Sequence, residues 1–158
     1  MEMSVVPSLR ERFQGCLFGL AVGDATGAPY EGLPGDMVFR MGPALSIVET
    51  PSEKTRYYTD DTQMAIGVAE TLIECGGIHE EVLCSAFARN YDPARGYGQG
   101  ARRVIEAMIT GEDWRRLARS LFPGGSLGNG AAMRVAPVGL MFRNDLDQVA
   151  AQADASKR

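Results

Sequence analysis

Two adjacent carboxylates mark the stretch of this sequence best suited to chemistry. From Tyr58 to Ala65 the chain reads "YTDDTQMA", in which Asp60 and Asp61 precede an apolar run with helical spacing. Carboxylate and hydroxyl oxygens are the ligands that Mg²⁺ prefers, so Thr59 is a third candidate ligand. Because neighbours in a helix point about 100° apart, we expect the pair to converge on one ion only through the non-helical geometry of a helix start.

The same residues also fit a plain helix cap. Thr59 or Asp60 is a suitable N-cap, Gln63 has capping-box spacing from Asp60, and Asp61 meets the positive end of the helix dipole. That dipole opposes a cation, so two carboxylates would have to supply more attraction than the dipole removes. From this stretch alone both interpretations stay open.

Two glycine-rich segments are further candidates. The first, "GDATGAPYEG", places Asp24 and Glu31 in a turn. Asp24 would end a helix or brace the turn, and Glu31 would be either a solvated acid or an acid that faces a ligand. The second, "PGGSLGNGAAMR", carries consecutive amides that can cradle phosphate oxygens. Its spacing matches neither the P-loop nor the dinucleotide-binding fingerprint, so a plain interhelical loop is the alternative.

The elements that must position these residues are helices. Helical spacing predicts a first helix capped by Ser8 and Glu11 that ends near Gly23, and later helices over the remaining apolar runs. These later helices are expected at 62–75, 79–90, 101–110, 114–121 and 145–156, with a further apolar run, "AAMRVAPVGLMF", broken at Pro137. Between Asp24 and Tyr57 no period is sustained, and 45–48 is the one candidate strand. Six or seven helices predict an all-α single domain over 1–158.

Composition narrows the function classes. The 158 residues are 45% hydrophobic and 23% charged, with a net charge of −4, so we expect a folded protein without attraction to nucleic acid or an anionic membrane. No segment approaches the ~20 apolar residues of a membrane span. Three cysteines without C-x-x-C spacing and one histidine argue against zinc and disulfide frameworks and suit a cytoplasmic location.

Four motifs together resemble the ADP-ribosylglycohydrolase family. From Arg12 to about Ser156, the chain carries in order "GCLFGLAVGDATGAPYEG", "YTDDTQMA", "GYGQGARRVIEAM" and "GSLGNGAAMR". The resemblance implies an orthogonal multi-helix all-α fold and a site for two Mg²⁺ ions. It also implies hydrolysis of the bond that joins ADP-ribose to a protein side chain.

The resemblance also implies residue roles. Thr59, Asp60 and Asp61 match the first group of metal ligands, and Asp60, Asp61 and Glu31 match the catalytic acids. Glu31 is further implied to lie near the substrate ribose. The implied ADP-ribose-binding loop, acting through the diphosphate, consists of Ser126, Leu127, Gly128, Asn129 and Gly130.

One family motif has no copy in this sequence. Family members supply the second group of metal ligands from a D-x-D-[ST] motif in their C-terminal half. Asp145 and Asp147 have D-x-D spacing, but Gln148 follows them and we do not give them this role. We therefore expect a domain that is incomplete at its C-terminal end, with apolar helix faces that favour oligomerisation or pairing with a complementing C-terminal segment.

Three functions follow from these observations. The leading one is a Mg²⁺-dependent hydrolase that removes ADP-ribose from ADP-ribosylated proteins or related compounds. A noncatalytic relative that binds ADP-ribose or has only a structural role is the first alternative, favoured by the missing ligand group. A different Mg²⁺-dependent phosphohydrolase is the second, because two aspartates and a glycine loop also suit a phosphate ester.

Overall fold

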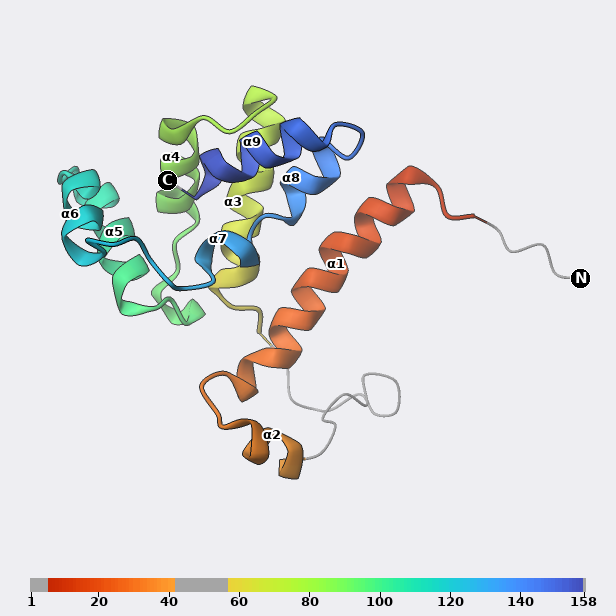
Figure 1. The fold of residues 1–158 in the computed structure, drawn as a ribbon, viewed down its shortest axis with the longest axis horizontal. Coiled ribbons are helices and arrows are strands. Elements are labelled where there is room, and N and C mark those ends of the chain that lie inside the picture. Colours follow the sequence, from red (N-terminus) through yellow and green to blue (C-terminus); the bar gives the residue numbers. More distant parts are fainter. Residues whose placement is uncertain (1–5, 42–56, 158) are drawn as a thin grey trace, which may run out of the picture. The chain divides into compact units, whose positions relative to one another are not determined.

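The computed structural model describes residues 6–41 and 57–157. Across these ranges every regular element is helical, with nine α-helices and two 3₁₀ turns, which confirms the all-α prediction. The candidate strand at 45–48 lies outside the described residues. The chain separates into two compact units, Met1–Thr59 and Asp60–Arg158, which are described in turn (Figure 1).

The first unit is built on one long helix. Helix α1 (Leu9–Gly27) begins at the predicted capping box, in which Ser8 Oγ accepts from the Glu11 N–H and the Glu11 carboxylate accepts from the Ser8 N–H. The helix runs to Gly27 rather than stopping near Gly23, because glycine is tolerated inside a helix at a cost of about 1 kcal/mol. A 3₁₀ turn (Ala28–Tyr30) and helix α2 (Gly35–Met41) follow, so part of the stretch expected to be irregular is helical.

The second unit contains the other seven helices described. They are α3 (Asp60–Cys75), α4 (Glu80–Asn90), α5 (Gln99–Thr110), α6 (Trp114–Leu121), α7 (Gly130–Met133), α8 (Ala136–Met141) and α9 (Leu146–Ser156), with a 3₁₀ turn at Pro93–Arg95. The predicted break near Pro137 is confirmed, since α7 and α8 are separate helices and Pro137 lies in the first turn of α8. This break and the additional helix α2 explain why six or seven predicted helices became nine.

Helix α3 is central to the second unit and contacts α4, α7 and α8 (Figure 1). Its buried apolar face carries Met64, Val68 and Leu72, which pack with Leu83 and Phe87 of α4. Burying such side chains stabilises the fold by roughly 1.5 to 3 kcal/mol each. The core therefore holds the helix whose first residues are Asp60 and Asp61.

Helices α3 and α4 approach closely at Gly67, in the middle of α3. A Cβ atom at this position would lie 2.8 Å from Cδ1 of Phe87 and 3.1 Å from its Cε1. Because carbon atoms pack best at about 3.5 to 4.0 Å, only glycine leaves room for the Phe87 ring here.

Across the described ranges, no helix is both long and apolar enough to span a bilayer.

Candidate functional site

Asp60 and Asp61 are the first two residues of α3 and are partly exposed. The helix thus starts two residues before the predicted Thr62, and the geometry is helical where we expected an irregular backbone. In this first turn the peptide N–H groups and the positive end of the helix dipole favour carboxylate charge. The pair is therefore well placed as a stable acidic cluster, and its two carboxylates project from successive helical positions.

Thr59, the residue before α3, is held by Asp24. Its N–H donates to Asp24 Oδ2 at 2.8 Å and its hydroxyl donates to Asp24 Oδ1 at 2.6 Å, both within the first unit. Asp24 therefore does not end α1, which continues to Gly27; it braces Thr59. Since the hydroxyl proton goes to Asp24, lone pairs on the hydroxyl oxygen remain available as a ligand. Thirty-five positions separate the two residues, so local spacing gave no sign of this pair.

Gln63 links the loop that contains Asp92 and Tyr97 to the first turn of α3 by hydrogen bonds. Its side chain is 7% exposed, and its Oε1 accepts hydrogen bonds from the Tyr97 hydroxyl at 2.8 Å and the Asp92 N–H at 3.1 Å. The rings of Tyr91 and Tyr97 meet edge to face with their centres 5.0 Å apart. The motif "GYGQG" thus contributes a buried tyrosine that is tied to the acidic turn, a role that spacing alone did not reveal.

Glu31 lies in the first unit at the end of the 3₁₀ turn. Its N–H donates to the Ala28 carbonyl at 3.3 Å, and its side chain is exposed. This backbone hydrogen bond places Glu31 at the edge of a glycine-rich turn.

The glycine loop leads directly into α7. Residues 126–129 are exposed, and the Leu127 side chain is fully exposed. Ser126 Oγ accepts from the Gly128 N–H at 3.1 Å, which shapes the loop locally, and Gly125 adopts a positive φ of 85° that favours glycine. Helix α7 contacts α3, and Figure 1 shows it beside the beginning of that helix. The second unit therefore places the helix that follows the glycine loop against the helix that begins with the acidic turn.

The donor set for a cation consists of hard oxygens. In the described part of the chain, no three His, Cys, Asp or Glu side chains come together as a metal site. The ligands predicted from the sequence are two carboxylates and one hydroxyl. Hard oxygens of this kind fit Mg²⁺, which keeps several water ligands when few protein oxygens are available.

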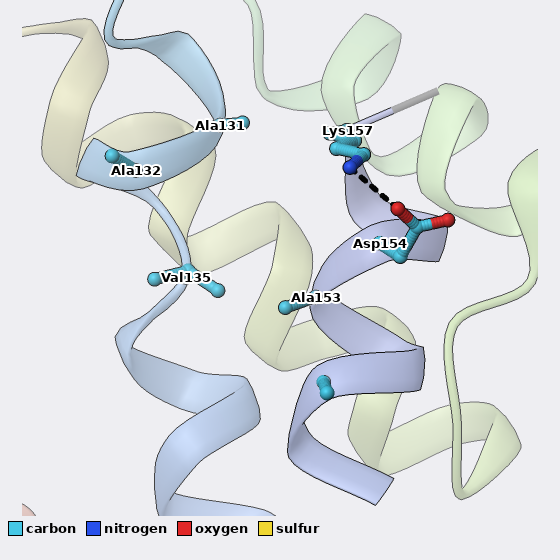
Figure 2. A pocket seen from close by; sticks show the side chains of 7 residues that line it. Ala131, Ala132, Val135, Ala153, Asp154 and Lys157 are labelled. Carbon is cyan, nitrogen blue, oxygen red and sulfur yellow. Dashed lines mark ion pairs between the residues drawn. The ribbon is translucent and has the colours of Figure 1, made fainter. Parts of the chain in front are cut away.

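A separate apolar pocket of about 370 Å³ lies between the α7–α8 segment and α9. Figure 2 shows small side chains on both walls and an ion pair between Asp154 and Lys157. Lys157 Nζ lies 2.5 Å from Asp154 Oδ1. The lining residues are Ala131, Ala132, Val135, Ala150, Ala153, Asp154 and Lys157. None of the predicted site residues lines this pocket, so it is distinct from the acidic turn.

Comparison with known proteins identifies the family. The family model for ADP-ribosylglycohydrolase matches residues 6–158, and the chain belongs to this family. It is 38% identical to the mouse ADP-ribosylhydrolase ARH3 over 86% of this chain and 40% of that protein. It is 30% identical to the ADP-ribosyl-[dinitrogen reductase] glycohydrolase of Rhodospirillum rubrum over 85% of this chain and 46% of that protein.

A third relative is an uncharacterized protein of Archaeoglobus fulgidus. It is 32% identical over 95% of this chain and 49% of its own length. The chain therefore spans 40 to 49% of the length of these three relatives.

Proposed function

We propose that this chain contributes to Mg²⁺-dependent removal of ADP-ribose from ADP-ribosylated protein side chains. The observation that carries the proposal is the contact between α3 and α7. This contact places the helix that begins with Asp60 and Asp61 beside the helix that follows the glycine loop. A site for a substrate that combines a glycosidic bond with a diphosphate needs these two kinds of group close together.

The acidic turn would hold the metal through Thr59, Asp60 and Asp61. Bound Mg²⁺ would supply positive charge that orients ribose hydroxyls and lowers the pKa of a water. Asp24 keeps the Thr59 hydroxyl in one orientation, and Gln63 ties the turn to the loop around Tyr97. These contacts fix the donors before substrate arrives, which limits the entropy lost on binding.

The remaining roles belong to protein groups at the substrate. A carboxylate stabilises the oxocarbenium-like charge at the anomeric carbon and accepts a proton from the attacking water. We assign this work to Asp60, Asp61 and Glu31. Backbone N–H groups within residues 126–130, other than that of Gly128, which donates to Ser126 Oγ, would bind the diphosphate, because amides in a glycine loop can point at phosphate oxygens.

Release of ADP-ribose from ADP-ribosylated peptides, measured with and without Mg²⁺, tests this function. We expect Asp60→Asn and Asp61→Asn to lower the rate by about 100-fold or more, since each removes a metal ligand and a catalytic charge. Asp147→Asn is the matched control, because Asp147 also lies exposed in the first turn of a helix of the second unit. Equal rates for Asp60→Asn, Asp61→Asn and Asp147→Asn would contradict the proposal.

One observation favours a noncatalytic function as the second candidate. Residues 126–129 of the glycine loop are exposed, so they could bind ADP-ribose whether or not the acidic turn holds a cation. Calorimetry with ADP-ribose and Mg²⁺ separates the two functions. Binding that weakens in Asp60→Asn, without turnover by the unaltered chain, would support a binding role and contradict catalysis by this chain alone.

A further inference from the structure

Arg134 is the last residue of the glycine-loop motif and lies at the junction of α7 and α8. Its side chain reaches three other helices of the second unit. Nη2 donates to the Ser156 carbonyl of α9 at 2.6 Å, and Nη1 lies 3.7 Å from Sδ of Met64 in α3. The guanidinium carbon lies 4.9 Å from the centre of the Phe87 ring in α4. One side chain therefore links α3, α4 and α9 to the end of the loop segment.

This guanidinium is a largely buried charge. Burial lowers the pKa of Arg134 to about 10, so the group stays protonated at neutral pH. Its contacts given above are a carbonyl, a sulfur and a ring. Within the described residues its buried Nε has no hydrogen-bond partner. The Ser156 carbonyl ends α9, where the helix dipole is negative, and this partly compensates the charge.

An apolar side chain of similar size would fill the same space with a smaller desolvation cost. Buried ions are often replaced by packed apolar residues without loss of stability, so stability alone is a weak reason for this arginine. An apolar side chain does not supply contacts with a fixed direction. The planar guanidinium fixes hydrogen bonds and ring stacking at set angles, which neither methionine nor lysine reproduces.

The contact with α3 falls on the face that carries Asp60. Met64 is four residues after Asp60, and residues at this spacing lie one above the other on a helix. At its other end, Arg134 is four residues after Gly130, the last residue of the predicted diphosphate loop. The guanidinium therefore bridges the helix face below Asp60 and the segment that leaves the loop.

We propose that Arg134 is a positioning residue that holds the end of the glycine loop against the Asp60-bearing face of α3. The packing role stands by itself, whereas the consequence for ligand binding rests on the proposed function. With the two segments held in register, Mg²⁺ at the acidic turn and ADP-ribose at the loop strengthen each other's binding. Without the guanidinium, each ligand binds without this mutual support.

Hydrogen exchange of the full chain tests the packing role without any ligand. We expect Arg134→Met and Arg134→Lys to speed amide exchange roughly 10-fold in residues 64–68 and 131–138, while residues 99–121 of α5 and α6 stay unchanged. Arg103→Met and Arg103→Lys are matched controls, because Arg103 is exposed on α5. Uniformly faster exchange, unchanged exchange, or full restoration by lysine would each overturn the positioning role.

Calorimetry tests the consequence for binding. In the unaltered chain we expect saturating Mg²⁺ to tighten ADP-ribose binding by about 10-fold, and in Arg134→Met by less than about 2-fold. Undiminished tightening in Arg134→Met would overturn the inference. If the unaltered chain shows no tightening, the proposed function fails, and the exchange experiment still decides whether Arg134 positions the loop.

Discussion

Substitution of Gly67 by alanine sets two opposing effects against each other. Alanine is favoured over glycine inside a helix by about 1 kcal/mol, which alone would stabilise α3. The added Cβ would lie 2.8 Å from Phe87 Cδ1, well inside the best carbon packing distance of about 3.5 Å. The Phe87 ring is 5% exposed and has the Arg134 guanidinium over it, so it has little room to move away.

The magnitude follows from these distances. Overpacking a core position by one methyl group costs about 1 to 3 kcal/mol, and the helix preference offsets about 1 kcal/mol of that. We therefore expect Gly67→Ala to lower the free energy of unfolding by about 1 kcal/mol. Gly139→Ala is the matched control, because Gly139 lies exposed inside α8 with no atom within 4 Å of an added Cβ. That variant should gain up to about 1 kcal/mol.

Urea unfolding followed by tryptophan fluorescence measures both variants. The chain has one tryptophan, Trp114 in α6, so the signal reports the second unit. Phe87→Leu provides a double-mutant cycle, since a smaller side chain relieves the clash and should cost less in the Gly67→Ala background. A Gly67→Ala variant as stable as Gly139→Ala, or additive effects in the cycle, would refute the close-packing argument.

Two further predictions concern buried polar groups and cysteines. Gln63→Leu removes the acceptor shared by the Tyr97 hydroxyl and the Asp92 N–H. In urea unfolding we expect the free energy of unfolding to fall by about 1 to 3 kcal/mol, which is more than in Tyr97→Phe. A fall equal to or smaller than that in Tyr97→Phe would contradict the shared-acceptor role. Burial, with Glu80 and Glu81 nearby, raises the pKa of Cys84 to about 11, so its thiolate fraction at pH 8 is low. We expect iodoacetamide to label the exposed Cys16 before Cys84, as measured by peptide mass analysis. Faster labelling of Cys84 would contradict this order and show that its helix face opens.

The elements with strong local signals were predicted closely. The capping box at Ser8 and Glu11 formed as expected, because its two hydrogen bonds join residues three apart. Pro137 separated two helices, since its ring excludes a hydrogen bond within a helix. Gly23 misled the prediction, because φ is not positive at Gly23 and a glycine without a positive φ can lie inside a helix.

The contacts around the candidate site lay beyond sequence reasoning. Residue types in "YTDDTQMA" and "GSLGNGAAMR" selected two segments whose site roles stay predictions, and the helices α3 and α7 that begin within them contact each other. The partners of Thr59 and Gln63 come from positions 35 and 34 residues away. Such pairs depend on how helices pack, which hydrophobic periodicity specifies only as a buried face.

The surroundings of Asp60 and Asp61 support the proposal that this turn is more than a helix cap. A cap needs one side chain that accepts from one or two backbone N–H groups. Here three contacts fall within residues 59–64. Asp24 accepts hydrogen bonds from Thr59, Tyr97 donates to Gln63, and Arg134 contacts Met64. The last of these includes a buried cation that an apolar side chain would replace at lower cost. Such contacts limit the movement of this turn, and limited movement suits the ion and substrate binding that we propose for it.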